Sequence, residues 1–161
     1  MEKENDSRGA AQKFSELTAL LLEYEKATLP LITCELDEVS EYIEARGRLM
    51  EKLREKNDEL TAFCAAQGGQ LAAAASCSCD RDTLPRELQE IFDARLEVSS
   101  VVTRLLSEER QAAERLTHER DGLISKIKDI NNGYNAQASK YYDVSRYNAD
   151  KYYFRQEPKK I

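Results

Sequence analysis

Residues 31–64 read LITCELDEVSEYIEARGRLMEKLREKNDELTAFC, and the spacing of their apolar side chains decides the fold class. Apolar residues that recur at alternating steps of four and three lie on one side of an α-helix and form a coiled-coil seam. Ten positions follow these steps, and eight of them are apolar: Ile32, Leu36, Val39, Ile43, Arg46, Met50, Leu53, Asn57, Leu60 and Cys64. The stretch therefore predicts a long helix, with the polar Arg46 and Asn57 weakening its seam and helping to fix the register.

A second long helix is expected over about residues 85–131. Pro85 suits the first turn of a helix, with Thr83 or Leu84 at the N-cap. The alternating steps continue in a weaker seam, where three of ten residues are charged: Val98, Val102, Leu105, Glu109, Ala112, Leu116, Glu119, Leu123, Lys126 and Ile130. Gly68-Gly69 should end the earlier helix, so residues 67–83 are expected to be a loop. The predicted fold class is all-α, a long antiparallel helical hairpin or coiled-coil-like bundle.

Residues 10–29 carry a separate helical pattern. Phe14, Leu17, Leu21 and Tyr24 follow steps of three, four and three, which place them on one helix face. Pro30 should break or kink the chain directly after this segment. Because two helices alone bury little apolar surface, three arrangements remain open. This segment folds back as a third helix, or the chain self-associates, or it takes up a helix from a partner.

The composition and the charge pattern narrow the function. Charged residues make up 34% of the chain and apolar residues 41%, a balance typical of long amphipathic helices. Residues 1–66 carry 15 acidic and 9 basic side chains, a net charge of −6, whereas residues 131–161 carry 3 and 6, a net charge of +3. An acidic body argues against nucleic-acid binding. The polar N-terminus predicts neither a signal peptide nor a membrane span, so we expect a cytoplasmic protein with reduced cysteines.

Few residues suggest chemistry. Cys77 and Cys79 could ligate a metal or form a redox pair, but a structural zinc site usually needs four ligands, so we interpret them as ordinary loop residues. His118, the only histidine, lies among charged residues on an expected helix face and has no reacting group beside it. No motif for phosphate binding or nucleophilic catalysis occurs. We therefore expect no enzyme activity, no cofactor and no metal site.

The end of the chain is rich in tyrosine. Asn131-Asn132-Gly133 should close the helical domain, residues 1–133, and leave residues 134–161 as a basic, flexible tail with little stable structure when free. Tyrosine is enriched at protein interfaces, so the tail is interpreted as a docking peptide. Two alternatives stay open, packing of these side chains onto the chain's own helices and stacking on nucleic-acid bases. The candidate partner-binding residues are Tyr134, Tyr141, Tyr142, Tyr147, Tyr152, Tyr153 and Phe154.

Four short segments resemble the FlgN type of flagellar type III export chaperones. They are Leu21-Leu22-Glu23-Tyr24-Glu25, then Asp37-Glu38, then Arg48-Leu49-Met50-Glu51-Lys52-Leu53, and finally Ile127-Lys128-Asp129-Ile130-Asn131-Asn132. The resemblance covers about residues 14–66 and 88–132. It implies a small cytosolic all-helical protein that holds hook–filament junction proteins before export. It also implies that the C-terminal segment engages the cargo, and that a tyrosine there, Tyr134 or a later one, docks at the export gate.

The expected function is therefore that of a chaperone that binds and shields hook-associated proteins before type III export. Its expected partners are a hook-associated export substrate and the export gate, with no nucleic acid and no stable membrane insertion. The alternative is a structural coiled-coil tether or adaptor. A homodimer is compatible with either function, because seams this thin leave apolar surface for another polypeptide to cover.

Overall fold

The computed structural model describes residues 2–153, and the side chains of residues 6–147 within them. This part of the chain is all-α and contains no strand, as the sequence predicts. The elements are helix α1 (Glu2–Thr28), the 3₁₀ turn η1 (Leu29–Ile32), α2 (Val39–Gln67), α3 (Gly69–Ala75), the 3₁₀ turn η2 (Arg81–Thr83) and α4 (Arg86–Tyr153). Contacts divide the chain into two units, Met1–Leu116 and Thr117–Ile161.

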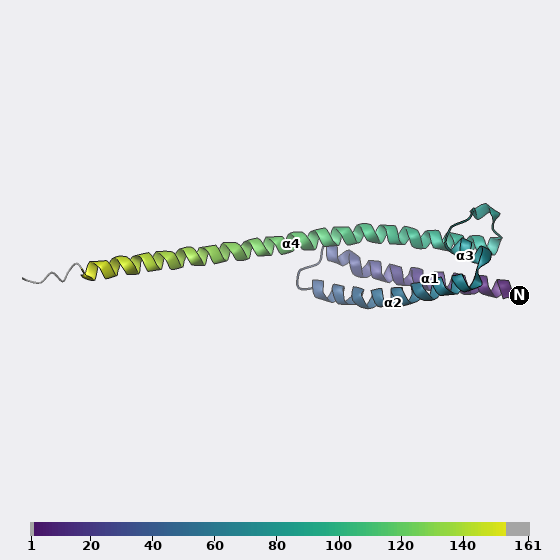
Figure 1. The fold of residues 1–161 in the computed structure, drawn as a ribbon, viewed down its shortest axis with the longest axis horizontal. Helices are drawn as coiled ribbons and strands as arrows, with labels where there is room; N and C mark the ends of the chain where they lie inside the picture. Colours follow the sequence, from purple (N-terminus) through teal and green to yellow (C-terminus); the bar gives the residue numbers. More distant parts are fainter. Residues whose placement is uncertain (1, 154–161) are drawn as a thin grey trace, which may run out of the picture. The chain divides into compact units, whose positions relative to one another are not determined.

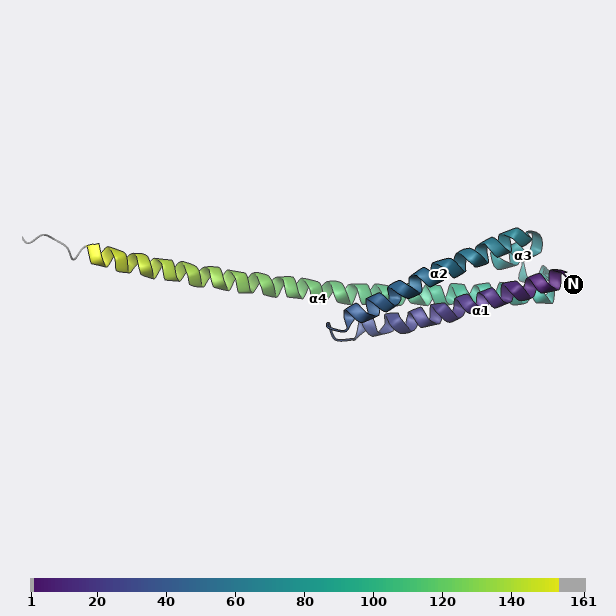
Figure 2. The ribbon, with the colours of Figure 1, turned by 90° about the horizontal axis from the view of Figure 1, so that it is seen from below.

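The first unit is a three-helix bundle of α1, α2 and the beginning of α4, which lie side by side in both Figure 1 and Figure 2. Helices α1 and α2 are antiparallel, since Lys13 pairs with Glu59 at 3.7 Å and Glu16 pairs with Lys56 at 3.6 Å. Helices α1 and α4 run in the same direction. Glu25 is bound by Arg104, and the carbonyl oxygen of Leu31 accepts a hydrogen bond from Arg115 at 3.1 Å.

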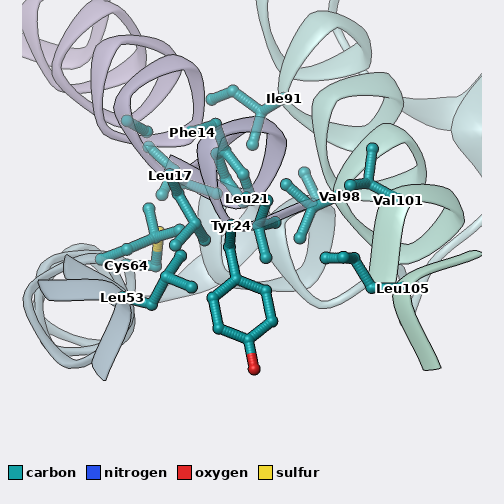
Figure 3. Close-up of a cluster of buried hydrophobic side chains, with 14 of the residues drawn as sticks. Phe14, Leu17, Leu21, Tyr24, Leu53, Cys64, Ile91, Val98, Val101 and Leu105 are labelled. Atoms are coloured by element: carbon teal, nitrogen blue, oxygen red, sulfur yellow. The ribbon is translucent and has the colours of Figure 1, made fainter. Parts of the chain in front are cut away.

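One face of α1 lies at the centre of the core. Phe14, Leu17, Leu21 and Tyr24 are all buried, which confirms the predicted face. Figure 3 shows these side chains between two sets that come from α2 and α4: Leu53 and Cys64 on one side, and Ile91, Val98, Val101 and Leu105 on the other. Of the three arrangements left open by the sequence, the fold-back of α1 as a third helix is therefore the observed one.

The turn between α1 and α2 explains how the chain reverses. Pro30 lies in the first turn of η1, where its fixed φ angle suits the start of a helix. The carbonyl oxygen of Pro30 accepts hydrogen bonds from the backbone N–H groups of Thr33, at 3.0 Å, and Cys34, at 2.7 Å. The guanidinium of Arg115 donates hydrogen bonds to the carbonyl oxygens of Leu31 and Cys34 and so fastens the turn to α4.

The predicted seam of α2 is corrected in its first half. Leu36, just before the helix, and Ile43 and Met50 on it are 45, 48 and 44% exposed. The side of α2 that faces the bundle carries another set with the same alternating steps: Arg46, Leu49, Leu53, Lys56, Leu60 and Phe63. The two sets share Arg46, Leu53 and Leu60. They lie within a few tens of degrees of each other around the helix, so spacing alone did not separate them.

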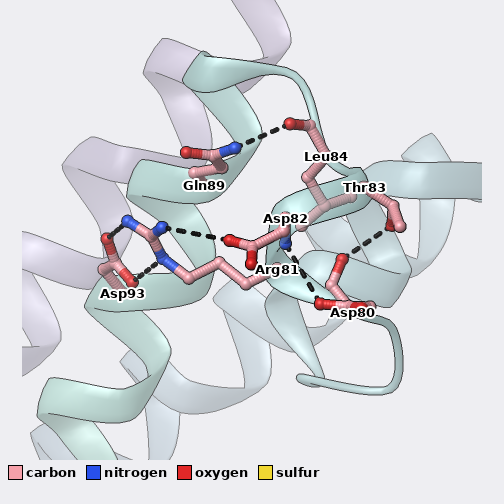
Figure 4. Close-up of polar contacts among 7 residues, drawn as sticks. All are labelled: Asp80, Arg81, Asp82, Thr83, Leu84, Gln89 and Asp93. Atoms are coloured by element: carbon pink, nitrogen blue, oxygen red, sulfur yellow. Dashed lines mark hydrogen bonds and ion pairs between the residues drawn. The ribbon is translucent and has the colours of Figure 1, made fainter.

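The predicted ends of the elements are mostly confirmed. α2 stops at Gln67, and Gly68 follows with φ +61° and ψ −166°. The alanine run forms the short helix α3, and α4 begins one residue after Pro85. Figure 4 shows how the loop before α4 is held, by a two-point ion pair from Arg81 to Asp93 at 2.7 and 2.6 Å. The Arg81 guanidinium lowers the pKa of the Asp93 carboxyl.

The expected helix end near residue 131 is wrong, because α4 continues to Tyr153. Residues 134–153 are thus helical, which also corrects the expectation of little stable structure in this part of the tail. Asn131, Asn132 and Gly133 each disfavour a helix by only about 1 kcal/mol or less relative to alanine. No proline occurs between Pro85 and Pro158 to force an end. The division of the chain at residue 133 stays a prediction.

Candidate protein-binding surface

The second unit exposes its side chains along the described part of α4. Every residue from 121 to 147 is exposed. Among the predicted binding residues, Tyr134, Tyr141, Tyr142 and Tyr147 are 68, 78, 76 and 66% exposed. Tyr152 and Tyr153 belong to α4, but their side chains lie outside the described residues, as does the whole of Phe154.

An apolar and aromatic row on α4, here called the α4 stripe, is the main feature of this unit. Its members follow alternating steps of four and three, so they share one side of the helix. They are Leu123, Ile127, Ile130, Tyr134, Tyr141 and Val144, with the polar Gln137 at the one remaining position of the series. Their exposure runs from 47% at Leu123 to 78% at Tyr141. This is a row of large side chains that another helix could cover.

The α4 stripe brings together only two of the predicted binding residues. Tyr134 and Tyr141 are members, whereas Tyr142 follows Tyr141 directly and is turned by about 100° around the helix. Tyr147 lies at the margin of the row, three residues after Val144. Sequence reasoning missed four members as binding residues, Leu123, Ile127, Ile130 and Val144, because Asn131-Asn132-Gly133 was interpreted as the end of the helix. The continued four–three spacing across Gly133 was the signal that could have identified them.

The margins of the α4 stripe carry little charge. Between residues 124 and 147, one margin has Lys126, Gly133, Lys140 and Tyr147, and the other has Ile124, Asn131, Ala138 and Ser145. The two lysines make one margin weakly basic, and the other margin is neutral. Small side chains at three of these eight positions, Gly133, Ala138 and Ser145, would let a second helix approach the stripe closely.

A polar cluster in the first unit joins all three bundle helices. Tyr24 of α1 donates a hydrogen bond to Glu109 of α4, and Arg46 of α2 contacts both, at 2.7 Å to the phenol oxygen and 2.6 Å to the carboxylate. The guanidinium carbon of Arg46 lies 5.0 Å from the centre of the Tyr24 ring. Burial is the main reason that the pKa of Tyr24 is raised. The Tyr24 phenol, the Glu109 carboxylate and one terminal nitrogen of Arg46 are joined by hydrogen bonds, whereas the buried Nε of Arg46 has no hydrogen-bond partner among the described residues. These bonds connect one residue of each bundle helix and so help to fix how the helices align.

The residues that suggested chemistry are not gathered into a reactive site. Cys77 is half-buried, burial raises the pKa of its thiol, and its sulfur lies 3.7 Å from the carbonyl oxygen of Phe92. A raised pKa leaves less of the reactive thiolate. His118 is an exposed residue of α4. Within the described residues, no group of three or more His, Cys, Asp and Glu side chains could hold a metal ion.

Comparisons with protein-family models, with curated proteins and with solved structures give no match to this chain. The resemblance to export chaperones of the FlgN type therefore stays a prediction. In the described part of the chain, no helix combines the length and the apolar character needed to cross a membrane.

Proposed function

We propose that this protein is a non-catalytic binding protein that captures an amphipathic helix of another protein on the α4 stripe. The observation that carries the proposal is the exposure of the stripe, six large apolar or aromatic side chains in one row. Contiguous apolar surface of this kind on a soluble protein usually marks an interaction site. Capture of a helix by such a row uses anchors at the same helical spacing.

The expected affinity for a partner helix depends on how much exposed apolar area of the α4 stripe that helix would bury. Complete burial of one large apolar side chain contributes about 1.5–3 kcal/mol. The stripe residues gain less than this, because the backbone and neighbouring side chains of α4 already cover part of each one. Association also loses several kcal/mol of translational and rotational freedom. We therefore expect micromolar affinity for a single helix, tightened by any contact that the partner makes elsewhere.

The specific role that we propose is that of an export chaperone in the cytoplasm. Its cargo would be a hook-associated protein, and its second partner the type III export gate. The support for this role is the resemblance of the four short segments, one of which contains the stripe residues Ile127 and Ile130. An amphipathic cargo terminus is apolar on one face and prone to aggregate, and the α4 stripe offers a row that would shield such a face.

A tether or adaptor is the second candidate. The four–three spacing of the α4 stripe favours it, because this spacing also builds permanent coiled coils. A tether should form a tight oligomer without cargo, whereas a chaperone should be a monomer or a weak dimer. Light scattering on the isolated chain separates the two functions.

The direct test is titration of the full chain with the terminal helical segments of hook-associated proteins. The double variant Ile127→Asn and Ile130→Asn places two amides in the stripe and should weaken binding at least tenfold. The control, Ser125→Asn and Ser139→Asn, places two amides on the opposite side of the same helix and should bind as the unaltered chain does. Absence of binding to every segment would reject the chaperone role, and equal binding by both variants would reject the stripe as its site.

A further inference from the structure

The α4 stripe has the pattern of a coiled-coil seam over three successive heptads. In heptad notation its a positions are Ile127, Tyr134 and Tyr141, and its d positions are Leu123, Ile130, Gln137 and Val144. An ordinary α-helix drifts by about 20° per heptad relative to this repeat. A strictly kept four–three repeat is therefore most useful to a helix that winds around another helix of the same repeat.

The width of the stripe suits two strands. The positions on either side of the seam, e and g, hold small or polar side chains over much of its length: Asn131, Gly133, Ala138 and Ser145. Assemblies of three or more helices need apolar side chains beyond a and d, because each helix there faces two neighbours. Only Ile124 at one end and Tyr147 at the other widen the row. A single partner helix can cover what remains.

The margin charges allow that partner to be a second copy of the chain. In a parallel pair in register, a g residue of one helix faces the e residue five positions later on the other. Lys126 would then face Asn131 of the second copy, and Lys140 would face its Ser145. Neither contact brings like charges together, so nothing at the margins opposes pairing of identical helices.

Gln137 favours a parallel over an antiparallel orientation of two paired α4 helices. A buried amide that lacks a hydrogen-bond partner costs free energy, and two facing amides can donate to and accept from each other. A parallel pair in register places the two Gln137 side chains opposite each other. In an antiparallel pair, a positions face d positions, so Gln137 would meet Ile127, Tyr134 or Tyr141 instead. A single polar residue in a seam commonly fixes register in this way.

We infer from these positions that two copies of the chain pair through the α4 stripe as a parallel, two-stranded coiled coil over residues 123–144. Pairing of the same surface on both copies is closed, so it ends at the dimer. The pairing covers the row of apolar side chains when no other protein is bound. It also places the two Gln137 amides opposite each other, where they can bond to each other when water is excluded.

Self-association is tested on the full chain alone, so the outcome does not depend on whether a cargo binds. Sedimentation velocity over two decades of concentration should show the mass rising from 18.4 kDa toward twice that value. The Ile127→Asn and Ile130→Asn variant should remain a monomer, and the Ser125→Asn and Ser139→Asn control should dimerise as before. A monomer at every concentration, or a dimer that survives in the stripe variant, would overturn the inference.

Orientation is tested by oxidation of single variants. Ile130→Cys places a thiol in the seam, where a parallel pair in register brings the two copies of it within disulfide distance. Asn132→Cys places the same thiol on the outer side of the helix, and the unaltered chain gives the background from its own four cysteines. Covalent dimers should form at least tenfold faster with Ile130→Cys. Equal rates for the two variants would overturn the parallel pairing.

Discussion

Leu21 and Leu22 are adjacent residues of α1 with the same side chain in opposite surroundings. Leu21 lies in the core and is 8% exposed, and Leu22 is 39% exposed. We expect Leu21→Ala to lower the free energy of unfolding by about 2–5 kcal/mol, because it loses buried apolar area and leaves a cavity. Leu22→Ala should change it by less than about 1 kcal/mol. Chemical denaturation of both variants measures the contrast, and equal losses would contradict the assignment of the buried face of α1.

Glu108 and Glu109 are also adjacent, and their carboxylates differ in their partners. Glu109 is bound by Tyr24 and Arg46. One oxygen of Glu108 is buried and has no hydrogen-bond partner among the described residues. Burial raises the pKa of Glu108, and the nearby Glu25 carboxylate raises it further. The folded state therefore holds this proton more tightly than the unfolded chain does, so ionisation of Glu108 costs stability as the pH rises above 4.5, its ordinary pKa.

Glu108→Gln should consequently stabilise the protein at pH 7, where it removes a poorly solvated charge. The gain should disappear in acid, where Glu108 is protonated in both the folded and the unfolded state. Glu109→Gln should act in the opposite direction and cost about 1 kcal/mol, because it weakens charge-assisted hydrogen bonds that are partly open to solvent. Thermal unfolding of both variants across pH values from acid to neutral measures the two effects. A Glu108→Gln variant that is less stable at pH 7 would refute the account.

Gly133 and Gly68 differ in backbone conformation, so replacing each by alanine should have opposite effects on stability. Gly133 lies inside α4, and a Cβ added there would meet no atom within 4 Å. Gly133→Ala should therefore stabilise this part of the helix by about 1 kcal/mol, since alanine favours the helix and loses less conformational freedom. Gly68 has φ +61° and ψ −166°, a conformation that is nearly restricted to glycine. Gly68→Ala should destabilise the first unit by about 1–3 kcal/mol.

Hydrogen exchange along α4 and chemical denaturation measure these two changes separately. Slower exchange around residue 133 with unchanged exchange in α2 is the expected result for Gly133→Ala. Faster exchange there would mean that Gly133 has a backbone conformation that alanine cannot adopt, so that the helix does not continue through Asn131-Asn132-Gly133. Such a result would support the earlier expectation that the helical domain closes at this point.

At the scale of the elements, the sequence predicted those features of the helices that depend on neighbouring residues alone. The three–four–three steps from Phe14 to Tyr24 predicted the buried face of α1. Gly68 predicted the end of α2, and Pro85 the start of α4. The seam of α2 was predicted less well, because α1 and α4 together select which of two overlapping rows faces inward. That choice packed Leu49 against the core and left Ile43 and Met50 exposed, and the spacing of the residues alone does not determine it.

The candidate surface was predicted in part for a related reason. Tyr134 and Tyr141 were identified from the composition of the tail, which requires no knowledge of helix ends. Ile127 and Ile130 were assigned to the end of a helical arm, because the two asparagines and Gly133 resemble a stop signal. Only the continued helix shows that these four residues form one row. A penalty of about 1 kcal/mol per residue is too small for sequence reasoning to decide whether a helix continues.

At the scale of the whole molecule, acidic and basic residues are segregated. Residues 1–116 contain 24 acidic and 15 basic side chains, a net charge of −9, whereas residues 117–161 contain 6 and 9, a net charge of +3. Two copies paired through residues 123–144 thus bring weakly like-charged segments together. The pairing has to come from apolar burial along the α4 stripe, not from attraction between the segments. Salt should screen the repulsion and leave the burial in place.

The same surface cannot be covered twice, so cargo and a second copy of the chain should compete for it. A fluorescent cargo helix titrated against the chain should show an apparent dissociation constant that grows with total chain concentration, because dimerisation removes free stripe. Gln137→Leu should strengthen the dimer by replacing a polar residue in the seam, and so weaken apparent cargo binding at high chain concentration. The Ser125→Asn and Ser139→Asn control should leave both equilibria unchanged.

An apparent affinity that is independent of chain concentration, in a chain shown to dimerise, would place the cargo on a different surface. The six stripe residues would then serve self-association alone, and the tether function would follow from them more directly than the chaperone function.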